Sequence, residues 1–243
     1  MKNGEVSGIC SNTSPFLLKK VMDILAYFQQ TLSPADYDRL IKSRHYKKGT
    51  YIYVPPNKPA EMFQVRSGVI KIGSYSEDGQ EVCYDLLFKQ EVFGNLRYLN
   101  GQFFEFAKAL TDCTVICIDL SFYKKMIVHD PVISDWFNLT TIQRWCRMET
   151  RLFKICSLSP FERIRAIYSE FEGIIKDPKG KAVFVPDLLS IVDIAQMTGI
   201  SRQTVSKLIK SIENSEGNKH HQLTSMKSRI IKNINKNVTQ NNY

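Results

Sequence analysis

Residues 190–213, SIVDIAQMTGISRQTVSKLIKSIE, form two short helical patterns on either side of a single glycine. Ser190 and Ser201 are good N-cap residues, and Gly199 suits a corner that needs a left-handed backbone. Small and apolar residues recur at the positions that a helix-turn-helix needs; they are Ile191, Ile194, Ala195, Gly199, Ile200, Val205 and Leu208. The spacing therefore predicts a DNA-binding helix-turn-helix, with a trihelical fold that does not bind DNA as the alternative.

Burial of Val205 and Leu208 leaves a polar face on the second helix. We expect four of its side chains to contact base edges in the major groove: Arg202, Gln203, Ser206 and Lys207. Three others, with the amides at the helix start, suit phosphate groups: Ser201, Thr204 and Lys210.

The charge of the chain fits that expectation. The 243 residues include 33 Lys and Arg against 24 Asp and Glu, a net charge of +9. Residues 181–243 hold nine Lys or Arg and four Asp or Glu, so more than half of the excess lies in the last quarter. A basic end suits a polyanionic partner, although a solvated basic surface gives the same count. With no apolar run of membrane-spanning length and a polar start, we expect a cytoplasmic protein.

Short β-type runs occupy the stretch from Lys48 to Leu120. They cover residues 51–54, 62–65, 69–75, 81–88 and 113–119, with a hairpin turn at 77–80 in which Asp78-Gly79 tolerates positive φ at both positions. This spacing predicts an antiparallel sandwich or barrel. Before it, residues 17–30 have a helical pattern, and a second short helix is expected at Ser33-Pro34.

A long helix is predicted to begin at Asp130-Pro131 and to run about 27 residues, or about 40 Å. Its apolar residues cover more than one face. One face can cover the β domain, and we expect the other to pair with a second copy of the chain, unless the helix is buried within one subunit.

Three further elements are expected between this helix and the helix-turn-helix. Ser159-Pro160 and Glu162 form a capping box that starts a helix expected to continue through Ile175. A turn at 177–180 and a short strand at 183–185 follow. Residues 214–243 are polar and basic and are either a weak amphipathic helix or a disordered tail.

This order of elements resembles the CRP/FNR family of bacterial transcription regulators. The resemblance covers about residues 20–213 and rests on RSGVIKI, SEDGQE and, above all, TGISRQTVSK at 198–207. It implies an α+β fold: a jelly-roll β-roll like a cyclic-nucleotide-binding domain, a long dimerisation helix and a C-terminal helix-turn-helix. It also implies a homodimer on a palindromic operator, with double-stranded DNA, its own copy and RNA polymerase as partners. The corresponding domains are 1–129, 130–157, 158–213 and a tail at 214–243.

The effector region departs from the nucleotide-binding members of the family. Those members have Gly-Glu-Leu and then Arg-Ser-Ala, where the Glu holds the ribose and the Arg the phosphate. Here the first motif is Gly94-Asn95-Leu96, and the second region, GQFFEF at 101–106, has no Arg. Burial of a cyclic phosphate without a cation would cost several kcal/mol. We therefore expect no control by cAMP.

The candidate effector pocket is lined by Gly94, Asn95, Leu96, Phe103, Phe104 and Met148. Its phenylalanines, with Phe106, either form an apolar pocket or simply fill the roll. No cofactor is expected. The family's iron–sulfur sensors have clustered N-terminal cysteines, whereas here only Cys10 lies there. His45 and His129 are haem-ligand candidates by residue type alone, and surface positions are the expectation for both.

Six scattered cysteines, none in a C-x-x-C pair, predict reduced core residues and no metal site. An enzyme of the cupin type would need histidine or carboxylate ligands on neighbouring strands, and residues 48–120 contain no histidine. A β-roll sensor or adaptor that does not bind DNA specifically remains the alternative function. No nucleophile–base constellation points to an enzyme.

Overall fold

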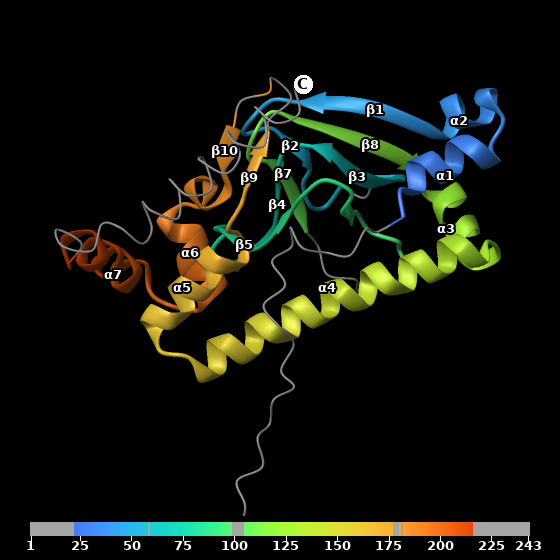
Figure 1. The fold of residues 1–243 in the computed structure, drawn as a ribbon. Coiled ribbons are helices and arrows are strands. Elements are labelled where there is room, and N and C mark those ends of the chain that lie inside the picture. Colours follow the sequence, from blue (N-terminus) through green and yellow to red (C-terminus); the bar gives the residue numbers. More distant parts are fainter. Residues whose placement is uncertain (1–21, 58, 99–104, 177–179, 181, 216–243) are drawn as a thin grey trace, which may run out of the picture.

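A computed structural model shows a β-roll with a long helix beneath it and a small helical domain at one end (Figure 1). It describes residues 22–57, 59–98, 105–176, 180 and 182–215. The roll consists of two four-stranded antiparallel sheets, and the predicted α+β fold class is confirmed. Within the described part of the chain, none of the helices has both the length and the apolarity that a bilayer span requires.

The strands of each sheet pair across large sequence separations. The first sheet has the order β1 (Ile41–Tyr46), β8 (Cys113–Asp119), β3 (Glu61–Ser67) and β6 (Val92–Phe93). The second has the order β2 (Tyr51–Tyr53), β7 (Phe106–Ala109), β4 (Ile70–Tyr75) and β5 (Glu81–Leu87). All five strands expected from the sequence are present, whereas β1, β6 and β7 were not predicted.

Strand β1 corrects the expectation that residues before Lys48 are polar or helical. It pairs with β8 from Ile41 opposite Ile118 to Tyr46 opposite Cys113. Only Ile41 of this edge strand is fully buried, so the sequence lacks the alternation that identifies a half-buried strand. This strand adds one histidine, His45, to the sheet, from outside the residues 48–120 that contain none.

The β4–β5 hairpin also differs from the expected two-residue turn. The carbonyl of Ser76 accepts a hydrogen bond from the Gly79 amide at 2.9 Å, and the carbonyl of Gln80 accepts one from the Ser76 amide at 2.9 Å. Gly79 has a φ of 73°, whereas Asp78 is not among the described residues with positive φ. The loop is therefore a three-residue turn with a glycine bulge, and only Gly79 needs the left-handed conformation.

Side-chain caps fix the starts of the helices around the roll. Asp23 caps α1 (Ile24–Thr31), Ser33 caps α2 (Pro34–Leu40), and Asp119 caps α3 (Leu120–His129), a helix that the sequence did not predict. Asp130 ends α3 and caps α4 (Pro131–Ser157), which has the expected 27 residues. The hydroxyl of Tyr27 in α1 donates to the Asp130 carboxylate at 2.7 Å, so this one residue contacts three helices: α3 through its backbone amide, and α1 and α4 through its side chain.

The C-terminal domain contains α5 (Pro160–Glu170), β9 (Ile174–Lys176), β10 (Ala182–Phe184), the 3₁₀ helix η2 (Val185–Leu188), α6 (Ile191–Thr198) and α7 (Arg202–Ser215). The expectation that α5 continues through Ile175 is wrong. Ile174–Lys176 pairs with Ala182–Phe184 as a hairpin, and its cross-strand hydrogen bonds replace the local helical pattern. The expected strand at 183–185 is β10, one residue earlier.

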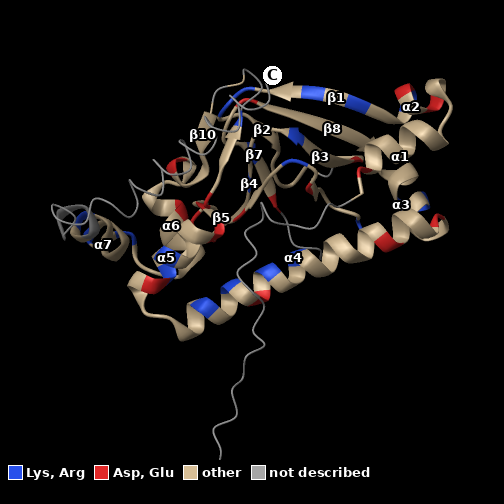
Figure 2. Cartoon of the chain, viewed as in Figure 1, with Lys and Arg blue, Asp and Glu red and all other residues tan. Residues whose placement is uncertain are grey.

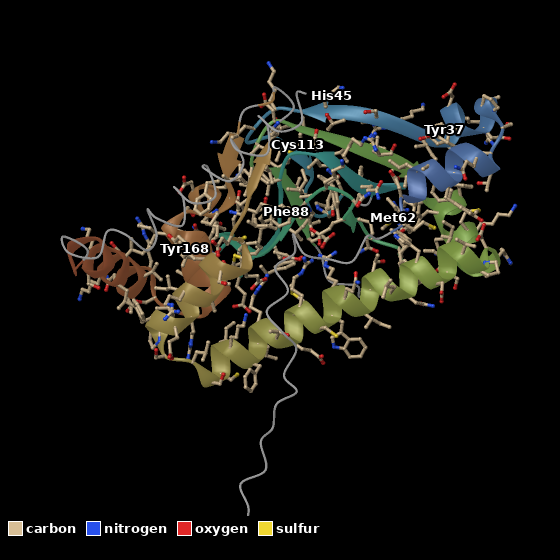
Figure 3. All side chains as sticks on the ribbon, viewed as in Figure 1. Tyr37, His45, Met62, Phe88, Cys113 and Tyr168 are labelled. Atoms are coloured by element: carbon tan, nitrogen blue, oxygen red, sulfur yellow. The ribbon has the colours of Figure 1, made fainter. Side chains whose placement is uncertain are left out.

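Three apolar clusters form the core, and Figure 3 labels at least one member of each. Cys113 belongs to the cluster inside the roll, where Tyr53, Phe63 and Phe93 stack with centroids 5.2–6.1 Å apart. Met62 belongs to the cluster under α1, α3 and the start of α4. Phe88 belongs to the third, which joins the roll to the C-terminal domain. The helical domain is therefore packed on the roll rather than tethered to it.

A buried carboxylate on β5 joins the roll to α4. Asp85 is fully buried, and its two oxygens lie 3.3–3.7 Å from the guanidinium nitrogens of Arg144, Arg147 and Arg151. Arg147 also pairs with Glu91 at 2.8 Å, and Arg151 pairs with Glu170 of α5. Although burial alone would lower the pKa values of Arg147 and Arg151, these carboxylates raise both above the usual arginine value. Both guanidinium groups therefore stay charged inside the protein.

We expect Asp85→Ala to lower the free energy of unfolding by about 3–5 kcal/mol, because two buried arginines lose a shared counterion. Urea denaturation at fixed protein concentration measures the change. Glu61→Ala is the matched control, since it removes only the exposed Arg44 pair and should cost about 1 kcal/mol or less. Equal losses for the two variants would contradict the central role of Asp85.

Candidate functional site

Helices α6 and α7 meet at a left-handed glycine corner. Ser190 and Asp193 form a reciprocal capping box at the start of α6, and Gly199 ends this helix with φ 64° and ψ 32°. The amide of Thr204 donates to the Ser201 hydroxyl at 3.1 Å, which caps α7. Val205 is fully buried, and Ile200 and Leu208 pack against the same cluster. The local geometry is that of a helix-turn-helix.

The polar face of α7 points away from the protein at the far end of the molecule (Figures 1 and 2). Arg202, Gln203, Lys207 and Lys210 are exposed, and Ser206 and Thr204 are half-buried. The Ser201 and Thr204 hydroxyls lie 2.8 Å apart, so the pair still has a donor for an external oxygen. The residues predicted to contact bases and phosphates therefore lie along α7 from its N-cap, Ser201, to its third turn at Lys210, and most of them are exposed.

The opposite face of this motif contacts the roll through polar side chains that the sequence did not reveal. Lys71 Nζ of β4 lies 2.6 Å from Asp193 Oδ1, and both residues are buried. The Gln196 side chain accepts from the Cys83 amide at 2.8 Å and donates to the Glu81 carbonyl at 2.6 Å. Helix α6 thus carries the capping group of the motif and its attachment to the roll.

Glu81 lies beside this attachment and organises the charges around it. Its carboxylate is 2.8 Å from Lys108 Nζ and 3.2 Å from Lys71 Nζ, and it accepts a hydrogen bond from Tyr51. Burial alone would raise the pKa of Glu81, but hydrogen bonds from Lys108, Tyr51 and Lys71 outweigh it and lower the pKa to about 2. Glu81 is therefore ionised at neutral pH. Together with Asp193 it balances the positive charges of Lys71 and Lys108.

Four of the six residues predicted to line an effector pocket lie in the described part of the chain, and each has contacts of its own. Gly94 has a φ of 118°, and a Cβ there would lie 3.2 Å from Met62 Sδ. Asn95 Oδ1 accepts from the Arg97 amide at 2.7 Å, within its own loop. Leu96 packs under the N-terminal helices, and Met148 is half-buried on α4. Phe103 and Phe104 lie outside the described residues.

Inside the roll, a carboxylate replaces the expected apolar lining. Glu105 accepts hydrogen bonds from the hydroxyls of Tyr53 at 2.6 Å and Tyr84 at 3.1 Å. Phe106 is fully buried, and its Cζ would be 2.4 Å from a Cβ at Gly73. Phe106 therefore fills the roll, whereas Glu105 is a negative group held by two tyrosine hydroxyls. A carboxylate at this position does not attract an anionic ligand.

One face of α4 is exposed along its whole length. Its exposed residues fall at 131–132, 135, 138–139, 141–142, 145–146, 149, 152–153 and 156–157, a repeat of 3.5 residues. Six large apolar side chains on it are 45–63 % exposed; they are Val132, Leu139, Ile142, Trp145, Leu152 and Phe153. A 3.5-residue apolar repeat is the pattern of a helix that pairs with another helix.

The remaining candidate ligands occupy ordinary positions. Cys83, Cys113 and Cys117 are buried and free, and burial raises the pKa of Cys83 to about 12 and that of Cys117 to about 11. Cys146 and Cys156 are exposed, which corrects the expectation of core positions, and Cys10 lies outside the described residues. His45 and His129 are exposed. Among the described residues, no group of three potential metal ligands occurs.

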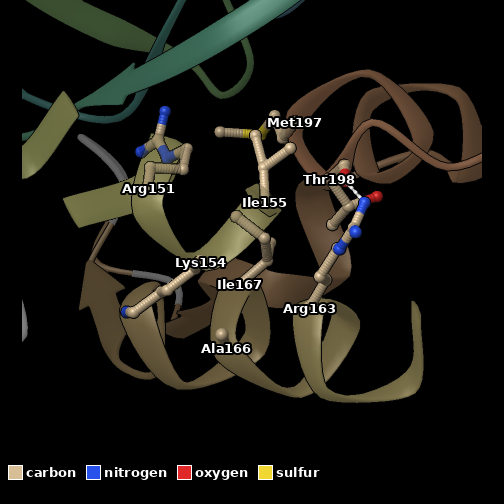
Figure 4. Close-up of a pocket in the computed structure, with 8 residues that line it drawn as sticks. All are labelled: Arg151, Lys154, Ile155, Arg163, Ala166, Ile167, Met197 and Thr198. Atoms are coloured by element: carbon tan, nitrogen blue, oxygen red, sulfur yellow. Dashed lines mark hydrogen bonds between the residues drawn. The ribbon is translucent and has the colours of Figure 1, made fainter. Parts of the chain in front are cut away.

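The junction of α4, α5 and α6 is packed closely (Figure 4). Its cavity of about 10 Å³ lies among Arg151, Ile155, Ile167 and Met197 and is no larger than the space for a single water molecule. The Arg163 guanidinium donates to the Thr198 carbonyl at 3.4 Å. The junction therefore has no room for an effector and acts as a structural joint.

Comparison with known proteins agrees with this architecture. Residues 43–130 match the cyclic nucleotide-binding domain family. A CRP-like cAMP-activated global transcriptional regulator of Mycobacterium tuberculosis is 23 % identical over 186 residues, which cover 76 % of this chain and 79 % of that protein. The global nitrogen regulator of Synechococcus elongatus is 21 % identical over 179 residues, covering 72 % and 81 %.

Solved structures share the fold at low identity. A cyclic nucleotide-binding domain containing protein from Listeria monocytogenes superposes with a TM-score of 0.60 at 15 % identity, covering 79 % of this chain and 90 % of that one. A CRP/FNR family transcriptional regulator from Thermus thermophilus gives 0.57 at 19 % identity, covering 72 % and 87 %.

Proposed function

Because this chain is a homologue of the CRP/FNR family of transcription regulators, we propose that it binds a palindromic DNA operator as a homodimer and regulates transcription. The observation that supports this most directly is the exposed polar start of α7, held out by a buried α6. The proposal divides the chain into a sensor domain (1–129), a dimerisation helix (130–157), a DNA-binding domain (158–213) and a tail (214–243). It includes RNA polymerase as a partner and no enzymatic activity.

The proposed contacts with DNA bases and phosphates follow from the position of each residue on α7. Arg202 and Gln203 lie in its first turn, where a side chain enters the major groove most directly, and Lys207 follows Gln203 by one turn on the same face. Arg202 suits guanine O6 and N7, and Gln203 suits adenine, with Ser206 and Lys207 as further base contacts. Ser201, Thr204 and Lys210 suit phosphates, which fix the position of the helix on the duplex.

The dimer role follows from the outward face of α4. A symmetric pair of these helices would cover the exposed apolar residues of both copies and place the two C-terminal domains on the same side. Two α7 helices would then meet half-sites about one helical turn apart. An operator with matching half-sites is therefore the expected ligand.

We propose that cAMP does not control this protein. GQFFEF at 101–106 has no arginine for a phosphate, and the carboxylate in this segment, Glu105, accepts hydrogen bonds from Tyr53 and Tyr84. The Mycobacterium relative is named as cAMP-activated, so the same ligand is the natural one to test here.

Arg202→Ala should weaken binding to the selected operator by about 1–3 kcal/mol and relax base preference at one position. Thr204→Val should instead weaken binding to all sequences alike, because it removes a phosphate contact. Selection from a random DNA pool followed by titration of the consensus measures both. An equal loss for Arg202→Ala on random DNA would demote that residue to a phosphate contact, and the lack of any consensus would favour the adaptor alternative.

Ile142→Glu should convert the dimer to a monomer, with a rise in the dissociation constant of about 100-fold or more, because two carboxylates would be buried at the centre of the pairing face. Sedimentation velocity measures the change. Val128→Glu is the control, since Val128 is 64 % exposed on α3, away from this face. If Ile142→Glu dimerises as the wild type does, α4 is not the interface.

Cyclic AMP at about 1 mM should leave the melting temperature unchanged, because a ligand stabilises a protein only in proportion to its binding to the folded state. Differential scanning fluorimetry checks this. A melting temperature that rises with cAMP concentration would contradict the proposal.

A further inference from the structure

Strand β5 lies at the edge of its sheet, and the side chain of Gln196 occupies its open side. The side-chain amide accepts from the Cys83 amide and donates to the Glu81 carbonyl, at 2.8 and 2.6 Å. A glutamine side chain offers the same donor and acceptor as a peptide group, so it takes the place of a neighbouring strand. Two hydrogen bonds to one planar amide fix the direction of α6 as well as its distance from β5.

A second contact fixes α6 at its start. Lys71 and Asp193 are 8 % and 4 % exposed, and their charged atoms lie 2.6 Å apart. The other oxygen of Asp193 accepts from the Ser190 amide at 3.0 Å and its hydroxyl at 2.6 Å. The Asp193 carboxylate thus both caps the start of α6 and pairs with Lys71 of β4. A substitution of Asp193 would therefore remove the cap and the contact together.

Apolar packing completes the attachment. Val69, Cys83, Leu86 and Phe88 of the roll share a cluster with residues of α6 and α7; the latter are Ile194, Ala195, Met197 and Val205. Gly199 then fixes α7 relative to α6. The orientation of α7 relative to the roll is therefore set by contacts on both sides of α6.

The same strand also carries α4. Asp85, two residues from Cys83, holds Arg147 and Arg151. Strand β5 thus contacts both α4, the helix proposed to pair two copies, and α6 of the helix-turn-helix proposed to bind DNA. Strand β5 therefore links α4 to α7, alongside the direct packing of α4 against α5 and α6.

We propose that Gln196, with the Lys71–Asp193 pair, is a positioning residue that sets the separation of the two DNA-reading helices and hence the half-site spacing that the protein accepts. This inference rests on the proposed DNA-binding homodimer. Gln196 does not contact DNA in this role. It acts by holding α6 on β5, so its loss changes spacing preference rather than base preference.

The test uses full-length protein and a series of palindromes in which the spacer differs by one base pair. Each added base pair moves a half-site by about 3.4 Å and turns it by about 35°. For the wild type we expect a loss of about tenfold or more in affinity per base pair away from the best spacer. For Gln196→Ala we expect a loss of about threefold or less, with unchanged affinity for DNA that carries a single half-site.

Three further variants make the result specific. Gln30→Ala changes an exposed glutamine on α1, at the other end of the molecule, and should keep the wild-type spacing profile. Lys71→Met removes the second contact and should flatten the profile as Gln196→Ala does, whereas Lys71→Arg keeps the charge and should largely restore it. Circular dichroism and melting temperatures confirm that each protein compared is folded.

The outcomes separate this inference from the proposed function. Wild-type protein without preference for any palindrome would overturn the proposed function itself. A sharp wild-type profile that both Gln196→Ala and Lys71→Met retain would overturn the positioning role alone. Tighter binding by either variant with the same profile would also overturn it, because the contact would then hold the domain away from DNA.

Discussion

The buried carboxylate of Asp85 is the interaction on which the arrangement of the molecule depends. Three arginines from α4 surround it, and one of them continues to Glu170 of α5. Buried charges are stable only when they are paired and hydrogen-bonded, so α4 cannot leave β5 without exposing or stranding several of them. The roll, the long helix and the C-terminal domain therefore form one body.

The elements that sequence analysis predicted correctly are those with a local chemical signal. The helix-turn-helix is predicted by its two N-caps, Ser190 and Ser201, and by Gly199 at the corner between the helices. Helix α4 is predicted by its N-cap, Asp130. Helix caps and a left-handed corner require particular residue types at particular positions. Helix α3 has a comparable signal in its N-cap, Asp119, which the sequence analysis did not use, whereas strand β1 has none. Strand β1 forms because it pairs with β8, and no local sequence pattern predicts that pairing.

The residues of the candidate site also divide into those that the sequence predicts and those that it does not. The outward residues of α7 could be named from spacing alone, since burial of Val205 fixes the other face. The inward contacts could not, because Lys71 and Asp193 are 122 positions apart and Gln196 has no property that marks it as a partner of β5. One signal was available: Arg144, Arg147 and Arg151 recur at helical spacing on one side of α4, which indicates a shared acidic partner.

The length of α4 has a mechanical consequence. A helix of 27 residues is about 40 Å long, so it acts as a lever. A tilt of about 5° at one end displaces the other by about 3.5 Å, close to the rise of one base pair. If two copies bind one duplex as proposed, an angular shift at β5 becomes a displacement along the DNA, so the spacing that the dimer accepts would depend on how firmly β5 holds its helices.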